Sequence, residues 1–326
     1  MIFSTKQIIL IPTRYLVFTI CLSFTFFAHS IDPAKIMGPD ECTECHDVEN
    51  SAWESTHHYS TFEEMPEQDE ALKIAEKLGI DDVVESENCQ SCHITMQSDG
   101  EEAEAIAGVS CESCHGGAAD WMDIHSEEDK AADQADAIWA KAESKGMIRP
   151  SNLTSLAANC LDCHLVNDPD LVNKGGHEAG SKFNLVTWSQ GEVRHNTFHS
   201  ENGENRLASK QKLRKMYVIG STLELQKSLL AYSKSSDKST DFAKAMLNRI
   251  EKTKAEIAQL PASDPLFASL QKVSASVPKS SLEENKSLAN ELMVLAKKVE
   301  KASSDPWGSI DKLISDLGPY KGTAQE

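Results

Sequence analysis

The residues best suited to do chemistry are cysteines and histidines arranged in one short unit that recurs four times. Each unit has two cysteines three positions apart, with a histidine directly after the second. Two thiols at this spacing can each add to a vinyl group of one porphyrin, and the adjoining histidine can then coordinate the iron as its proximal ligand. The four units are Cys42, Cys45 and His46; Cys89, Cys92 and His93; Cys111, Cys114 and His115; and Cys160, Cys163 and His164.

A single pair of cysteines at this spacing could instead form a redox-active disulfide or half of a zinc site. A zinc site needs no histidine after every second cysteine, and disulfide chemistry needs only one copy. Every cysteine after residue 30 belongs to one of the four units. The sequence therefore predicts four covalently bound haem c groups.

Six further histidines after residue 30 could supply the second, distal ligand of each iron, two more than four haems need. They are His57, His58, His125, His177, His195 and His199. Met96 and Met122 are weaker candidates, because methionine more often fills a core. A protein whose irons all have two histidine ligands transfers electrons, whereas an open iron can bind a small molecule such as nitric oxide or hydroxylamine.

The order and spacing of motifs over about residues 40–200 resemble the cytochrome c-554 family of tetrahaem electron carriers. The resemblance rests on four segments: Asp40–His46, Trp53–His58, Gly108–Gly116 and Asp123–His125. It does not extend to the C-terminal part of the chain.

The resemblance implies distal ligands for the first and third haems. His125 would face His46 across the first iron. His58 would face His115 across the third, with the neighbouring His57 as the alternative.

For the fourth haem, attached beside His164, the resemblance implies His195 as the distal ligand. His199 lies four residues later and would share the same face of a helix. The second haem of the family, here attached beside His93, lacks a strong protein ligand in its sixth position. His177 follows two glycines and departs from the family pattern, so it could complete the second haem or replace His195 at the fourth.

The first 30 residues have the features of a secretory signal. Lys6 and Arg14 precede an apolar run at 15–27, and small residues stand at positions 28 and 30. The run is short for a membrane span of roughly 20 residues, although an uncleaved anchor is the alternative. We expect cleavage near Ser30 and export of residues 31–326 to the periplasm or beyond.

Charge divides the 326-residue chain into two parts. Residues 31–203 hold 10 basic and 36 acidic residues, a net charge of −26, whereas 204–326 hold 20 basic and 15 acidic, a net charge of +5. We predict a tetrahaem domain at 31–203 and a C-terminal helical domain at 204–326. The acidic balance argues against nucleic acid as a partner and favours basic redox proteins.

The fold class predicted is mainly α. Aromatic residues make up only 6% of the chain, so the haems themselves would form the core of the first domain, wrapped by short helices and loops. Within it we expect helices over Glu67–Leu78 and Asp120–Glu143.

Apolar residues at helical spacing predict a C-terminal bundle. One stripe runs from Phe242 to Ile257 and ends before Pro261. Asp264 would cap a second helix, Ser281 a third, and a fourth would begin at Asp305 and end at Gly318.

These patterns support three hypotheses about function. The first is an exported tetrahaem c-type cytochrome that carries electrons between partner proteins, with at most peripheral membrane contact. The second is a redox enzyme that acts on a small nitrogen oxide at an open second haem. The third is a surface or filament subunit in extracellular electron transfer, with the oligomeric state left open.

Overall fold

The computed structural model describes residues 31–326, except 101, 127–134, 199, 201–202 and 323–326. The predicted signal sequence and His199 lie outside the described residues. Among the helices that are described, none is both long enough and apolar enough to cross a membrane.

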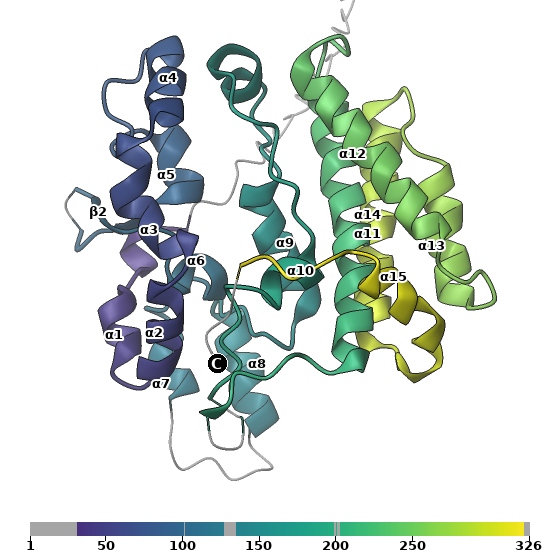
Figure 1. The fold of residues 1–326 in the computed structure, drawn as a ribbon, viewed down its shortest axis with the longest axis horizontal. Coiled ribbons are helices and arrows are strands. Elements are labelled where there is room, and N and C mark those ends of the chain that lie inside the picture. The colour runs from purple at the N-terminus through teal and green to yellow at the C-terminus, as the bar shows by residue number, and fades with distance from the viewer. Residues whose placement is uncertain (1–30, 101, 127–134, 199, 201–202, 323–326) are drawn as a thin grey trace, which may run out of the picture.

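Short helices joined by loops make up the first part of the chain, as Figure 1 shows in purple to teal. A two-stranded antiparallel sheet, β1 (Thr95–Gln97) with β2 (Glu104–Ala107), lies between the second and third cysteine units. The helices here are α1 (Pro39–Thr43), α2 (Asp47–Glu54), α3 (His57–Glu64), α4 (Asp69–Leu78), α5 (Glu87–His93), α6 (Cys111–His115), α7 (Met122–His125), α8 (Ala135–Ser144), α9 (Leu153–His164) and α10 (Leu185–Ser189).

Longer helices form the C-terminal part, drawn in green and yellow in Figure 1. The long helix α11 contacts α12 and α14, and on its other side it contacts α9 and α10 of the first part. The elements here are α11 (Lys210–Lys234), α12 (Asp241–Ala258), α13 (Pro265–Ala275), α14 (Leu282–Lys301), a 3₁₀ turn at Asp305–Ile310 and α15 (Asp311–Ser315).

The largest hydrophobic cluster combines α9 with the C-terminal helices. Leu153, Ala157 and Leu161 of α9 are buried in the same cluster as residues of α11 and α14. The first part of the chain has smaller clusters, such as the one around Trp121. The apolar core therefore crosses the proposed domain boundary and holds one face of the helix that carries the fourth unit.

Of the two helices expected before residue 203, the structure contains the first almost as predicted. Helix α4 begins at Asp69 and ends at Leu78, where Gly79 adopts a left-handed conformation with φ 70°. The segment Asp120–Glu143 is helical in α7 and α8, and the part between them lies outside the described residues.

Three of the predicted C-terminal helices correspond to α12, α13 and α14. The Asp264 carboxylate accepts hydrogen bonds from two backbone N–H groups at the start of α13, and the Ser281 hydroxyl accepts one at the start of α14. The segment after Asp305 differs from the prediction. It is a 3₁₀ turn that precedes the short α15, and the backbone at Trp307 leaves helical geometry.

A buried carboxylate fixes the segment before the first unit against the third unit. Glu112 is 1% exposed, and its oxygens accept hydrogen bonds from the backbone N–H groups of Met37, Gly38 and Ala118 at 2.7–3.1 Å. These bonds tie the segment before the first unit to α6.

We expect Glu112→Gln to lower the free energy of unfolding by about 2 kcal/mol, because the amide cannot replace all the charge-assisted bonds to backbone N–H groups. Guanidinium unfolding followed by far-UV circular dichroism measures the change. Glu44→Gln is the matched control, since Glu44 occupies an exposed position inside the first unit. Equal stability of the two variants would contradict the role of Glu112.

Candidate haem-binding sites

Helix geometry places the three chemical groups of each unit on one side. Residues at positions i, i+3 and i+4 of a helix share a face, and the two cysteines and the histidine have this spacing. Helices α5, α6 and α9 end at His93, His115 and His164, and the next residue in each case leaves the helical conformation. His46 lies between α1 and α2.

Each unit's histidine ring has a second histidine ring opposite it among the described residues. Two metal–imidazole bonds of roughly 2 Å, with roughly 1 Å from each nitrogen to its ring centre, would separate the ring centres by about 6 Å. The observed separations fit an iron between the rings. They are 6.4 Å for His46 and His125, 6.3 Å for His93 and His177, 6.1 Å for His115 and His195, and 6.2 Å for His164 and His58.

Hydrogen bonds fix which ring nitrogen is free to bind iron. A backbone carbonyl can only accept, so an Nδ1 atom that bonds to one must carry the proton, which leaves Nε2 available as a ligand. Nδ1 donates to the carbonyl of Ile148 from His115, of Met122 from His125, of Glu178 from His177 and of Val193 from His195.

Burial keeps the rings of His93, His115 and His164 neutral. It lowers the pKa of His93, His115 and His164 to about 4. At neutral pH these rings carry no second proton and present a nitrogen lone pair, the form that coordinates a metal.

Two of the expected pairings are exchanged in the structure. His58 faces His164 rather than His115, and His195 faces His115 rather than His164. The reason is tertiary: α3 packs on α5 and α5 packs on α9, which carries His58 to the end of α9. His125 faces His46 as the resemblance implies.

Of the remaining candidate distal ligands among the described residues, one lies opposite a proximal histidine and the others do not. His177 faces His93 of the second unit, one of the two places left open for it. The ring of His57 is 85% exposed and bonds to the Glu192 carboxylate at 2.9 Å, so it turns away from the proximal ligands. Met96 and Met122 pack against small apolar clusters.

Residues in the segments that resemble the cytochrome c-554 family hold the backbone of His58 in place. The His58 carbonyl accepts a hydrogen bond from the Val109 N–H at 3.0 Å, and the Trp53 indole donates to the Val109 carbonyl at 2.8 Å. Gly108 is needed here, since a Cβ atom at this position would lie 2.5 Å from the His58 carbonyl oxygen.

Sequence reasoning did not single out the groups that orient the fourth proximal ring. The Ser181 hydroxyl lies 2.8 Å from His164 Nδ1, and the Phe183 ring stacks on the His164 ring with centroids 4.4 Å apart. These residues follow the unit by 17 and 19 positions and belong to no motif, so no local signal marks them.

Contacts between thiols show which units are neighbours. Cys111 lies close enough to Cys42 to raise the pKa of Cys42, and α1 packs on α6. Cys92 likewise raises the pKa of Cys163, and α5 packs on α9. Cys114 is close enough to raise the pKa of Cys160, although burial is the larger cause. The first unit therefore lies beside the third, the third beside the fourth, and the fourth beside the second.

An alternative metal chemistry finds no support in the part of the chain that the structure describes. No group of three or more histidine, cysteine, aspartate or glutamate side chains is arranged there to hold a metal ion by itself. The paired rings need a cofactor that brings its own equatorial ligands, as a porphyrin does.

Comparison with known proteins agrees with this chemistry. The family model described as cytochrome c554 and c-prime matches residues 41–116, which include the first three units. Cytochrome c-554 of Nitrosomonas europaea is 26% identical over 140 residues, which cover 40% of this chain and 58% of that protein. No solved structure matches the chain. Both comparisons confirm the resemblance to the cytochrome c-554 family, and the three units that the family model covers fit a c-type cytochrome with covalently bound haem c.

The exchange of ligands can be tested with two variants. We expect His58→Ala to produce one high-spin haem in the electron paramagnetic resonance spectrum, and His57→Ala to leave the spectrum unchanged. In a background that lacks the fourth haem, Cys160→Ala with Cys163→Ala, His58→Ala should add no high-spin signal. A new high-spin signal in that background would assign His58 to another haem.

Proposed function

We propose that this protein is an exported electron carrier with four haem c groups, each with two histidine ligands. The observation that supports the proposal most is the set of facing imidazole rings, with centroids 6.1–6.4 Å apart at each of the four units. An iron held between two protein ligands exchanges electrons with neighbouring haems without binding a substrate.

The coordination of the second haem decides between an electron carrier and an enzyme. The family resemblance leaves the sixth position of this iron without a strong protein ligand. Here the loop after α9 brings the His177 ring opposite His93, which supports His177 as the missing ligand. Gly176 adopts φ 83°, a conformation that side chains rarely allow, and Gly175 lies so close to α4 that a Cβ atom would be 3.0 Å from Leu78 Cδ1. The two glycines let the turn pack on α4 while His177 faces His93.

The neighbouring units imply an order for electron transfer. The thiol contacts link the first unit to the third, the third to the fourth and the fourth to the second. The electrostatic influence of His46 on the pKa of His115, and of His58 on that of His93, supports the same order. We place the first and second haems at the two ends of the path, where partners would donate and accept electrons.

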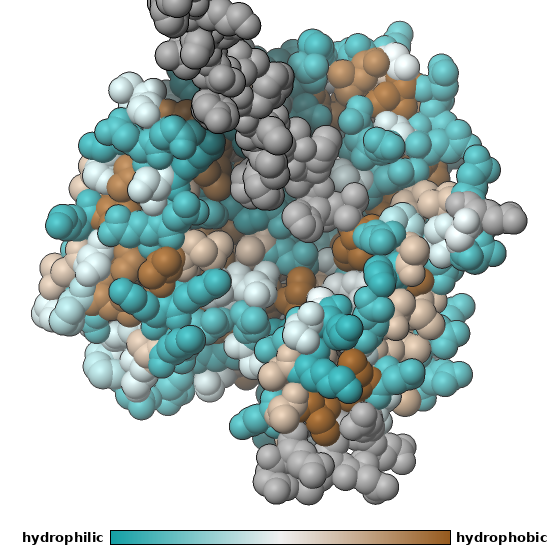
Figure 2. Space-filling view, turned by 180° about the vertical axis from the view of Figure 1, so that it is seen from behind, coloured by the Kyte–Doolittle hydropathy of each residue, from teal (hydrophilic) through white to brown (hydrophobic). Residues whose placement is uncertain are grey.

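The charge of the haem region favours a basic partner. Residues 31–203 carry a net charge of −26, and hydrophilic residues cover most of the face shown in Figure 2, with hydrophobic residues in small groups. Complementary charge of this kind mainly raises the rate of association and is screened by salt. Export follows from the leader at 1–30 and from haem attachment, which takes place outside the bacterial cytoplasm.

The haem count is tested by the mass of the mature protein. We expect the exported chain to begin after Ser30 and to carry the added mass of four haems, with all four reducible in an anaerobic titration. A mass equal to that of the bare polypeptide would exclude the proposal.

The role of His177 is tested by spectroscopy. Oxidised wild-type protein should show only low-spin iron, and the reduced protein should not bind carbon monoxide. His177→Ala should create one high-spin haem that binds carbon monoxide, because the second iron loses its sixth ligand. His57→Ala is the matched control and should behave as wild type. High-spin iron in the wild type would favour the enzyme with an open haem.

A further inference from the structure

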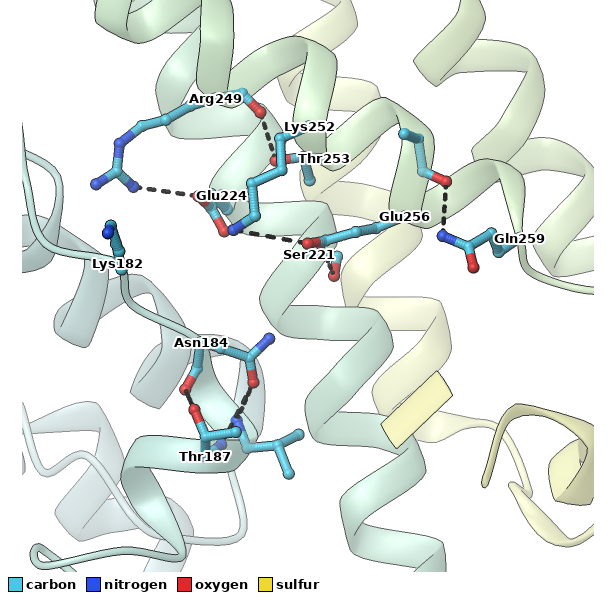
Figure 3. Close-up of polar contacts among 12 residues, drawn as sticks. Lys182, Asn184, Thr187, Ser221, Glu224, Arg249, Lys252, Thr253, Glu256 and Gln259 are labelled. Atoms are coloured by element: carbon cyan, nitrogen blue, oxygen red, sulfur yellow. Dashed lines mark hydrogen bonds and ion pairs between the residues drawn. The ribbon is translucent and has the colours of Figure 1, made fainter. Parts of the chain in front are cut away.

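An arginine of the C-terminal helices reaches the loop that holds the proximal ligand of the fourth haem. Arg249, on α12, donates from Nη2 to the carbonyl of Ser181 at 2.6 Å and to the carbonyl of His164 at 3.3 Å. Figure 3 shows its guanidinium extending from α12 toward the segment that carries Lys182 and Asn184. One side chain thus bridges two points of the chain that are 17 residues apart.

The side chains of the two bridged residues, Ser181 and His164, are hydrogen-bonded to each other. The Ser181 hydroxyl lies 2.8 Å from Nδ1 of His164. When Nε2 binds iron, Nδ1 carries the proton, so the hydroxyl accepts it and fixes the ring orientation. The loop approaches very closely here: at Gly180, with φ 111°, a Cβ atom would lie 2.4 Å from the His164 carbonyl oxygen and 2.7 Å from Arg249 Nη2.

A buried glutamate orients the arginine. Glu224 of α11 accepts a hydrogen bond from Arg249 Nη1 at 3.1 Å, and the side chains are 6% and 13% exposed respectively. Figure 3 shows the Glu224 carboxylate between Arg249 and Lys252. A pair removed from water in this way favours one geometry, and loss of Glu224 leaves the Arg249 guanidinium without its carboxylate partner.

We propose that Arg249, oriented by Glu224, is a positioning residue for the fourth haem: it holds the Ser181 loop so that the Ser181 hydroxyl accepts a hydrogen bond from Nδ1–H of His164, which sets the reduction potential of that haem. The inference rests on the proposed function, because it requires a haem at the fourth unit. The C-terminal helices then tune the redox chain as well as supporting α9.

The direction of the effect follows from ligand basicity. An acceptor at Nδ1 makes the imidazole a stronger donor to iron and stabilises the ferric state. Its loss raises the potential. Ser181→Ala should therefore shift one of the four midpoint potentials upward and alter the low-spin g values of the same haem. If Arg249 acts through the loop, Arg249→Gln should raise the midpoint potential of that same haem.

Arg249→Lys separates positioning from charge. Lysine keeps the positive charge but lacks the planar fork that bridges two carbonyls and a carboxylate. If Arg249 acts by positioning, Arg249→Lys and Glu224→Gln should raise the midpoint potential of the fourth haem, as Arg249→Gln does. A purely electrostatic role predicts wild-type behaviour for Arg249→Lys and a downward shift for Arg249→Gln, since a nearby positive charge favours the ferrous state.

Arg214→Gln is the matched control for stability. Arg214 of α11 also combines an ion pair, to Asp311 at 2.7 Å, with a bond to a backbone carbonyl, that of Ser304 at 3.0 Å. This variant should lower thermal stability yet leave all four potentials unchanged. The proposal fails if Arg249→Gln leaves the four potentials and g values as in wild type, lowers the potential, or shifts them no more than Arg214→Gln does. The wild-type spectrum tests the proposed function separately.

Discussion

The proposed haem sites depend on one relation, two imidazole rings held opposite each other with centroids 6.1–6.4 Å apart, the distance that an iron between them would set. Burial is the main cause of the lowered pKa of His93 and His115, and the opposite rings of His177 and His195 lower it further, since two protonated rings would repel. Apart from the residues of α9 and α10 that join the C-terminal core, the first part of the chain has small apolar clusters among its described residues. Short helices and loops of this kind make physical sense when the porphyrins fill the space between them.

The C-terminal helices supply what the haem region lacks, an ordinary apolar core. That core reaches across to α9, whose buried Leu161 lies between the two cysteines of the fourth unit. The same helix therefore carries the fourth unit and packs on α11. Lys227 of α11 also pairs with Asp162 of this unit. A rigid support on one side of the fourth haem limits how far its ligands can reorient when the iron changes oxidation state.

Sequence spacing predicted the attachment units, which are local, and missed the pairing of histidine rings, which depends on tertiary packing. The thioether cysteines and proximal histidines follow from positions i, i+3 and i+4 of a single turn. The distal ligands are brought in by helix packing, so the resemblance implied His58 and His195 as ligands but exchanged their partners. Helix α11 escaped detection for a different reason. It is buried on nearly every face from Arg214 to Ala231, so it shows no apolar stripe with a polar opposite face.

The order of the units gives the fourth haem its importance. In the proposed path, which runs first, third, fourth and second, this haem would be an interior step, and every electron that crosses the protein would reside on it. A change of its potential alters transfer in both directions, whereas a change at a terminal haem acts mainly on exchange with one partner. It is this interior haem whose proximal ring is held, through Ser181 and Arg249, by the C-terminal helices. On this proposal, a region without a haem-attachment unit of its own would govern the rate of the whole path, which gives a physical reason for joining it to the haem region in one chain.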